Sequence, residues 1–178
     1  MTPRLFLGAV ALSVLLLGAC ASPPAPSDYM AERPVLDLKT YLNGDLTAHG
    51  MFTDRSGKVV RRFTVAMKCS WVGDDGVFDE DFTYSDGKKE RRVWRIKKLP
   101  GGQYTGTAGD VVGTARGQAA GNALQWNYTL SLPVDGSVYE VQFDDWMFLI
   151  DERVMLNKAV MSKFGFRLGE VTLSFYKN

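Results

Sequence analysis

The chain has 178 residues, enough for one domain with its own core. Its 21 basic and 20 acidic residues give a net charge of +1, and residues 1–19 contain one basic and no acidic residue. Without these residues the net charge is zero, so the sequence lacks the basic excess that attracts nucleic acid or acidic lipid. We therefore expect no nucleic-acid partner.

Residues 1–19 have the layout of a secretion signal. Arg4 precedes an apolar run over residues 5–17, and small residues then lead to Cys20. The run of about 13 residues would span roughly 20 Å as a helix. A bilayer core needs about 20 residues. We therefore interpret this run as a signal peptide and not as a permanent transmembrane anchor.

Residues 17–20 (Leu-Gly-Ala-Cys) resemble the bacterial lipobox, whose cysteine is acylated and becomes the first residue of the mature protein. The alternative is an ordinary signal peptide with a chance cysteine. Ala21 and Ser22 follow Cys20, with no aspartate beside it. By the sorting rule of enterobacterial lipoproteins, this pattern indicates the outer membrane. We expect lipidation of Cys20 and a lipid-anchored envelope protein that faces the periplasm.

Residues 20–34 are rich in Pro, Ala and Ser and have no apolar periodicity. This composition predicts a flexible tether between the lipidated cysteine and the folded domain. The folded domain is then expected over residues 35–178.

This domain reads as antiparallel β-structure. Turn-forming Asp, Asn and Gly residues separate stretches of about eight to twelve residues in which apolar and polar side chains alternate. In one such stretch the apolar residues are Leu124, Trp126, Tyr128, Leu130 and Leu132. The pattern predicts nine or ten strands, and the short turns favour an all-β, up-and-down barrel over a Greek-key sandwich. Residues 152–164 fit both strand and helix spacing, and we favour strand.

Few residues carry a recognisable chemical motif. Cys69 has no partner once Cys20 is acylated, so we expect a buried small hydrophobe in preference to a reactive thiol. His49, the single histidine, has no ligand-type residue at metal-binding spacing. We found no nucleophile turn and no phosphate-binding loop. We expect neither a metal nor a cofactor.

Two features stand out as candidate interior polar groups. Asp144 and Asp145 interrupt an apolar strand, and on a strand they point to opposite faces, so one should face the barrel interior. Arg92 shares its strand face with Trp94. An inward Asp and Arg92 could orient a ligand head group or act in acid–base chemistry. The other interpretation, which we favour, is a structural ion pair that closes one barrel end, with Trp94 and Trp146 as core.

Several motifs together resemble a bacterial lipoprotein family known as domain of unknown function 3833. They occupy residues 82–87, 92–94, 102–106, 110–117, 121–128, 144–147 and 161–165, within a resemblance that covers about residues 38–177. Tyr41 departs from the phenylalanine expected there. The resemblance implies a calycin-type, lipocalin-like barrel without an established activity. The family's genes tend to lie near those of fatty-acid-modifying methyltransferases, which implies a lipid-related role.

Three functions remain open, with a binding barrel favoured. The first is a lipocalin-like barrel that binds a fatty acyl or other apolar ligand. The second is an enzyme that uses Asp144 or Asp145 with Arg92 or Lys163. The third is a structural or interaction lipoprotein whose barrel is filled by its own side chains. The candidate ligand-binding or interior polar residues are Arg92, Trp94, Asn127, Tyr128, Asp144, Asp145, Trp146 and Lys163.

Overall fold

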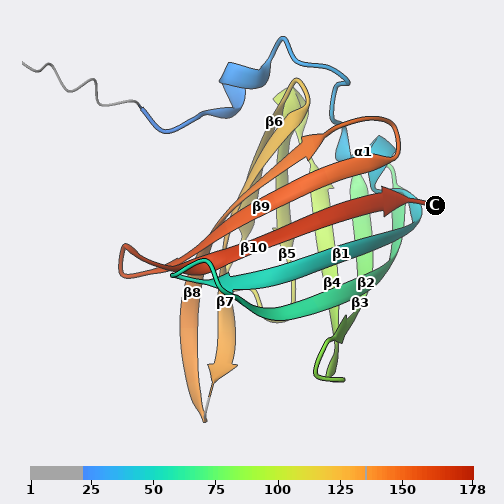
Figure 1. The fold of residues 1–178 in the computed structure, drawn as a ribbon. Helices are drawn as coiled ribbons and strands as arrows, with labels where there is room; N and C mark the ends of the chain where they lie inside the picture. Colours follow the sequence, from blue (N-terminus) through green and yellow to red (C-terminus); the bar gives the residue numbers. More distant parts are fainter. Residues whose placement is uncertain (1–21, 135) are drawn as a thin grey trace, which may run out of the picture.

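The computed structural model describes residues 22–134 and 136–178 (Figure 1). The predicted signal peptide and Cys20 lie outside these residues. The strands are β1 (Gly44–Asp54), β2 (Val59–Val72), β3 (Asp75–Tyr84), β4 (Lys89–Lys98), β5 (Gln103–Thr107), β6 (Ala115–Ala120), β7 (Ala123–Val134), β8 (Ser137–Leu149), β9 (Val154–Lys163) and β10 (Phe166–Lys177). The short helices are η1 (Pro26–Tyr29), α1 (Leu38–Tyr41) and η2 (Pro100–Gly102). No helix in the described ranges is long and apolar enough to cross a membrane.

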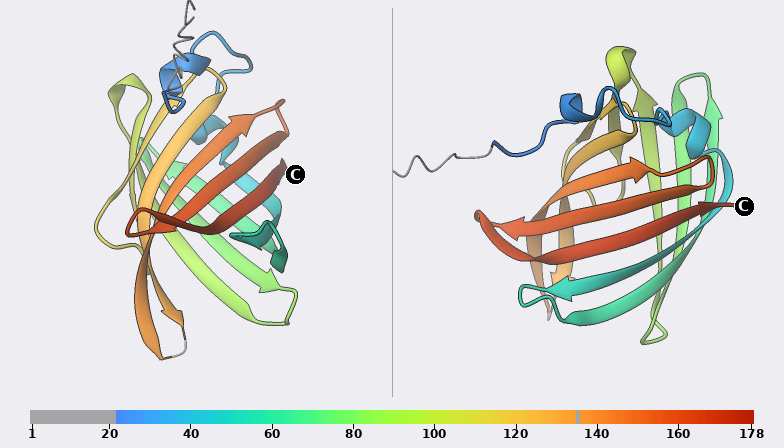
Figure 2. Two further views of the ribbon diagram at one scale, coloured as in Figure 1. Left: turned by 60° about the vertical axis from the view of Figure 1, so that its left-hand side comes forward. Right: turned by 45° about the horizontal axis from the view of Figure 1, so that its top comes forward.

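The ten strands form one closed barrel. Each strand pairs antiparallel with its sequence neighbours, and β1 closes the barrel against β10 (Figures 1 and 2). The prediction of an all-β, up-and-down barrel is therefore confirmed. Residues 154–163, where helix remained an alternative, form strand β9.

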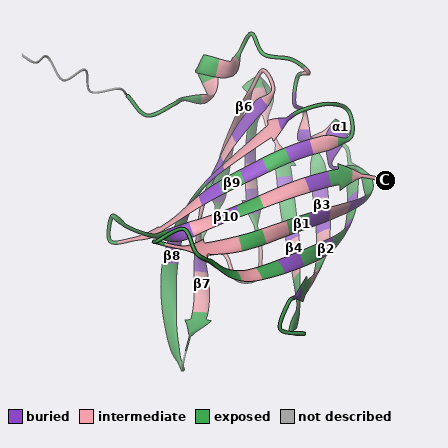
Figure 3. Ribbon diagram, viewed as in Figure 1, coloured by how far each residue is buried: buried purple, intermediate pink, exposed green. Residues whose placement is uncertain are grey.

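Side-chain alternation follows the sequence pattern. In β2, Phe63, Val65 and Met67 are buried, whereas Thr64 and Lys68 between them are exposed (Figure 3). Period-two alternation places one set of side chains inside the barrel and the other in solvent.

Cys69 ends this buried row and forms no disulfide with any residue in the described ranges. Burial raises the pKa of its thiol to about 12. The thiolate, which is the nucleophile, is therefore disfavoured, as expected for a small buried hydrophobe.

Helix α1 covers one end of the barrel, which we call the closed end. Leu38 and Leu42 beside it are buried against the interior. Asp37 caps the helix by accepting a hydrogen bond from the backbone of Lys39 at 2.9 Å, and it pairs with Lys98 at 2.6 Å. The opposite, open end carries the β1–β2, β3–β4, β7–β8 and β9–β10 hairpins and the loop over residues 108–114 (Figure 2).

Part of the predicted tether is ordered against the barrel wall. The Tyr29 ring of η1 lies 5.2 Å from Phe148 and 5.7 Å from Trp146, measured between ring centroids. The backbone of Leu36 donates a hydrogen bond to Gly121 at 2.8 Å. The flexibility predicted for residues 20–34 stays a prediction, and within this segment η1 packs on the barrel wall through the Tyr29 ring. This segment leaves the barrel near the closed end (Figure 1).

Candidate functional site: an apolar cavity with a polar cluster

The barrel interior holds a cavity of about 1050 Å³. It begins at Leu38 and Leu42 of the closed end and reaches Val60, Val134 and Leu168 at the open end. Small-molecule sites typically measure about 300–1,000 Å³ and have mostly apolar walls. This cavity is therefore large enough for one extended ligand.

Aromatic rings form much of one wall. The Trp94 ring lies 5.8 Å from Trp126 and 5.5 Å from Tyr128, both edge to face. Tyr128 stacks on Phe143 at 4.9 Å. Gly106 and Gly117 lie against the Trp126 ring, and a β-carbon at either position would clash with it. The two glycines thus allow the strands to approach the Trp126 ring closely.

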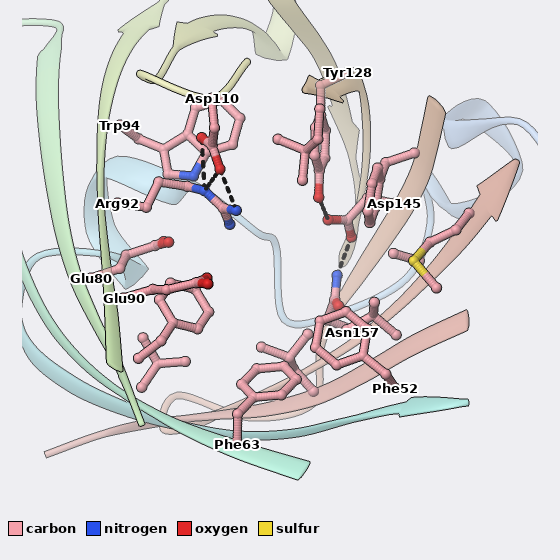
Figure 4. Close-up of a pocket in the computed structure, with 18 of the residues that line it drawn as sticks. Phe52, Phe63, Glu80, Glu90, Arg92, Trp94, Asp110, Tyr128, Asp145 and Asn157 are labelled. Carbon is pink, nitrogen blue, oxygen red and sulfur yellow. Dashed lines mark hydrogen bonds and ion pairs between the residues drawn. The ribbon is translucent and has the colours of Figure 1, made fainter. Parts of the chain in front are cut away.

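Arg92 points from β4 into the cavity and is paired with Asp110 from the loop between β5 and β6 (Figure 4). Its Nε lies 3.0 Å and its Nη2 2.7 Å from Asp110 Oδ2. Burial alone would lower the pKa of Arg92, but the hydrogen bonds to Asp110 and the charges of Glu80 and Asp110 raise it overall. The guanidinium is therefore charged and already engaged by a carboxylate.

Glu80 lies on β3, directly opposite Arg92 in the β3–β4 register. It lines the cavity, is half-buried, and has no side-chain hydrogen bond within residues 22–134 and 136–178. Burial raises the pKa of Glu80 to about 7, against the opposing effect of Arg92. Glu80 can therefore change its charge near neutral pH.

Asp145, Asn157 and Tyr128 form a second polar group on the facing wall (Figure 4). Asn157 Nδ2 donates to Asp145 Oδ1, and the Tyr128 hydroxyl donates to Asp145 Oδ2 at 3.4 Å. Burial raises the pKa of Asp145 to about 7, although these two hydrogen bonds oppose the shift. Burial and the Asp145 charge also raise the pKa of Tyr128, so its hydroxyl stays protonated.

The open end exposes apolar side chains. Phe164 and Phe166, in the β9–β10 hairpin, are 85% and 73% exposed. Val60, Val134 and Leu168 are also exposed while lining the cavity. An apolar molecule can therefore reach the interior along apolar surface.

Four of the predicted site residues line this cavity: Arg92, Trp94, Tyr128 and Asp145. The expectation that one of the two adjacent aspartates faces inward holds for Asp145. The expected ion pair between the inward aspartate and Arg92 is absent from the described chain. Arg92 is bound by Asp110 instead, whereas Asp145 is held by Asn157 and Tyr128.

The other four predicted residues lie outside the cavity. Asn127 and Asp144 are exposed and pair in register on the outer surface, because alternation turns them away from Tyr128 and Asp145. Trp146 stacks on Phe148 outside the barrel and is not core. Lys163 lies over the Tyr139 ring at 4.4 Å, near the hairpin tip.

Sequence reasoning missed Glu80, Asp110 and Asn157. Glu80 stands between Phe78 and Phe82, so the same alternation could have placed it inside. Asn157 stands between Met155 and Ala159 in the same manner. Asp110 lies in a loop without periodicity, and no sequence signal reveals that it folds onto Arg92. Among the described residues, no three His, Cys, Asp or Glu side chains converge as metal ligands.

Solved structures share this architecture. The S-type phycobiliprotein lyase from Guillardia theta superposes with a TM-score of 0.58 at 6% identity, over 87% of this chain and 98% of that one. A DUF3598-family protein of unknown function from Nostoc punctiforme gives 0.56 at 11% identity, over 83% of this chain. This chain spans only 51% of that protein's length. No curated protein matches the sequence.

The closed antiparallel arrangement with a hollow interior defines the protein as an up-and-down β-barrel, a fold that it shares with the phycobiliprotein lyase. The family model described as "Protein of unknown function (DUF3833)" matches residues 14–177. The chain therefore belongs to the DUF3833 family.

Proposed function

We propose that this protein is a lipid-anchored barrel of the bacterial envelope that binds one lipid or other apolar ligand in its interior. The observation that carries the proposal is the cavity of about 1050 Å³, with apolar walls and a few convergent polar groups. Sites of this kind bury most of a ligand's surface and use the polar groups to orient it. The apolar side chains around the open end support passage of such a ligand.

The proposed anchor has a consequence for orientation. Cys20 would precede η1 by only a few residues, and η1 packs near the closed end. A chain of about six extended residues reaches roughly 20 Å. The open end would then face away from the point of anchoring, or the barrel would lie on its side. Acylation at Cys20 would supply the membrane attachment, since acyl chains contribute about 0.8 kcal/mol per buried methylene.

The alternatives have less support. A barrel filled by its own side chains conflicts with the cavity volume. An enzyme based on Asp144 or Asp145 with Arg92 or Lys163 has less support, because Asp144 and Lys163 lie outside the cavity and Arg92 is bound by Asp110. Asp145 does line the cavity, but it is held by Asn157 and Tyr128. A binding protein needs only the cavity itself.

Ligand extraction tests the proposal. The full chain is taken from its envelope with a lipid-preserving copolymer, so that no detergent competes for the cavity, and its lipids are identified by mass spectrometry. Ala159, buried on the cavity wall, gives the control variant Ala159→Phe, whose ring would occupy the cavity. We expect one compound to be enriched in the native protein over the variant. Identical extracts from both proteins would contradict the proposal.

A further inference from the structure

The charged groups of the cavity are not balanced. Each basic side chain that lines it has a carboxylate within 4 Å: Arg61 with Asp86, Lys88 with Glu90, Arg91 with Asp79 and Arg92 with Asp110. Glu80 and Asp145 have no such cation anywhere in the part of the chain that is described. The interior therefore contains two carboxyl groups without an ion-pair partner within 4 Å, the half-buried Glu80, which lies opposite Arg92, and the buried Asp145.

A third acceptor lies beside them. Asn157 is only 3% exposed, and its Oδ1 atom has no hydrogen-bond partner among the residues described. Its Nδ2 is already used, because it donates to Asp145 and to the backbone oxygen of Trp146. A buried polar atom of this kind normally has a partner, and leaving one unpaired is costly. Asn157 lines the cavity, so a bound ligand can supply the missing donor.

Two hydrogen-bond donors inside the cavity already donate to carboxylates of the protein itself. The guanidinium of Arg92 faces Asp110 through both Nε and Nη2, and the Tyr128 hydroxyl donates to Asp145. Glu80 lies on one wall and Asp145 with Asn157 on the facing wall (Figure 4). Beside Asp145 and Asn157 the cavity therefore offers hydrogen-bond acceptors, whereas the Nη1 atom of Arg92, which no hydrogen bond to Asp110 uses, remains a donor on the other wall.

We propose that the ligand is a long-chain amine, whose protonated amino group binds between Glu80, Asp145 and Asn157. This inference rests on the proposed function and names the head group that the cavity selects. A primary ammonium has three donors and no acceptor, which complements the three acceptors. It also supplies the positive charge that the two carboxyl groups lack.

A fatty acid fits the same site poorly. Its carboxylate would approach Glu80 and Asp145, and like charges in a low-dielectric interior repel strongly. The one deep cation, Arg92, already forms a bidentate pair with Asp110. An alcohol can donate one hydrogen bond but brings no charge, so it should bind with intermediate affinity.

The test compares three ligands with one chain length: dodecylamine, dodecanol and dodecanoate. Each is titrated into the full chain at pH 8, below the concentration at which it aggregates, and tryptophan fluorescence reports on Trp94 and Trp126. We expect the amine to bind about tenfold more tightly than the alcohol, since hydrogen bonds to charged groups carry roughly this advantage. The acid should bind most weakly.

Four variants locate the effect. Glu80→Gln and Asp145→Asn should each weaken the amine about tenfold and leave the alcohol nearly unchanged. The matched control is Asp144→Asn, which removes the neighbouring carboxylate from the outer surface and should alter no preference. Asp110→Asn should improve binding of the acid relative to the amine, because it releases Arg92.

The outcomes separate the two proposals. If none of the three compounds binds saturably, the proposed function itself fails. If the alcohol or the acid binds at least as tightly as the amine, the binding function stands and the amine assignment is overturned. The assignment also fails if both Glu80→Gln and Asp145→Asn retain the full preference for the amine, or if Asp144→Asn abolishes it.

Discussion

Asp144 and Asp145 are adjacent in sequence and occupy opposite environments. Asp144 accepts a hydrogen bond from Gln125 on the exposed surface at 2.7 Å, whereas Asp145 is 7% exposed inside the barrel. The pleat of the strand alone separates them, because successive side chains point to opposite faces. Burial raises the pKa values of Asp145 and Glu80 to about 7, so the charge of the barrel interior changes with pH at these two groups.

Glu80→Gln should make folding less sensitive to pH. Burial raises the pKa of Glu80 from 4.5 to about 7, so the native state binds the proton more tightly than the unfolded chain. The stability that protonation provides is complete below about pH 4.5 and is lost as pH rises through about 7. The variant should match the native protein at pH 4 and exceed its stability by on the order of 2 kcal/mol at pH 8.

Urea unfolding at both pH values measures this difference. The control is Asp144→Asn, at an exposed carboxylate. Equal stability of the Glu80→Gln variant and the native protein at pH 8 would show that the Glu80 carboxyl is solvated.

Asp110→Ala should destabilise the fold by about 2 kcal/mol, because it leaves the Arg92 charge inside the barrel without its partner. The Arg92 side chain is 21% exposed, so the loss is smaller than for a fully buried pair. Asp79→Ala breaks the pair with Arg91, whose side chain is 64% exposed, and should destabilise the fold less than Asp110→Ala does. Thermal unfolding of both variants compares the two losses, and equal losses would contradict a special role for Asp110.

At this scale, sequence reasoning works where a strand imposes alternation. It placed Arg92 on the face of Trp94 and required one of the two aspartates to face inward. Sequence reasoning could not predict the pairing of Asp110 with Arg92. Asp110 lies in a loop without alternation, and the position of this loop depends on how the barrel closes. Asn127 and Trp146 lie on the outer face of their strands, one residue away from the inward Tyr128 and Asp145, as the same alternation requires.

At the scale of elements, the short segments before the barrel depend on tertiary contacts. Pro-rich composition predicts a tether, but η1 packs its Tyr29 ring on Phe148, and Leu36 bonds to Gly121. Neither contact can be predicted from the local sequence, because each joins residues that are far apart in the chain. The barrel strands differ, because their alternation and turn residues are local signals.

Gly121→Ala should displace η1 from the barrel. Gly121 has a φ of +54°, and a β-carbon there would overlap the backbone oxygen of Tyr29. The left-handed backbone alone costs a non-glycine residue roughly 1–2 kcal/mol. Gly57→Ala is the matched control, since Gly57 also has a positive φ but has open space around it.

Limited proteolysis distinguishes the two variants. Cleavage within residues 26–36 should accelerate in Gly121→Ala and stay at the native rate in Gly57→Ala. Equal cleavage in both variants would contradict the packing of η1 against the β6–β7 turn.

At the scale of the whole molecule, the sequence predicted the barrel but not its hollow interior. Alternation and turns determine how many strands form and which side chains face inward. The free volume depends on how the side chains fill the closed sheet, for example on Ala159 and on the loop that carries Asp110. These quantities arise only after the barrel closes. The choice between a filled and a hollow barrel therefore required the structure.

The central claim is that one apolar chain binds inside the barrel cavity, and a chain-length series tests it without reference to the head group. Dissociation constants are measured by native mass spectrometry for n-alcohols of increasing length, with the native chain and with Ala159→Phe. We expect one ligand per chain and an approximately fourfold gain in affinity for each added methylene, about 0.8 kcal/mol, until the cavity is full. The plateau should come at a shorter chain in Ala159→Phe. Binding without a plateau, or with the same plateau in both proteins, would contradict an interior site.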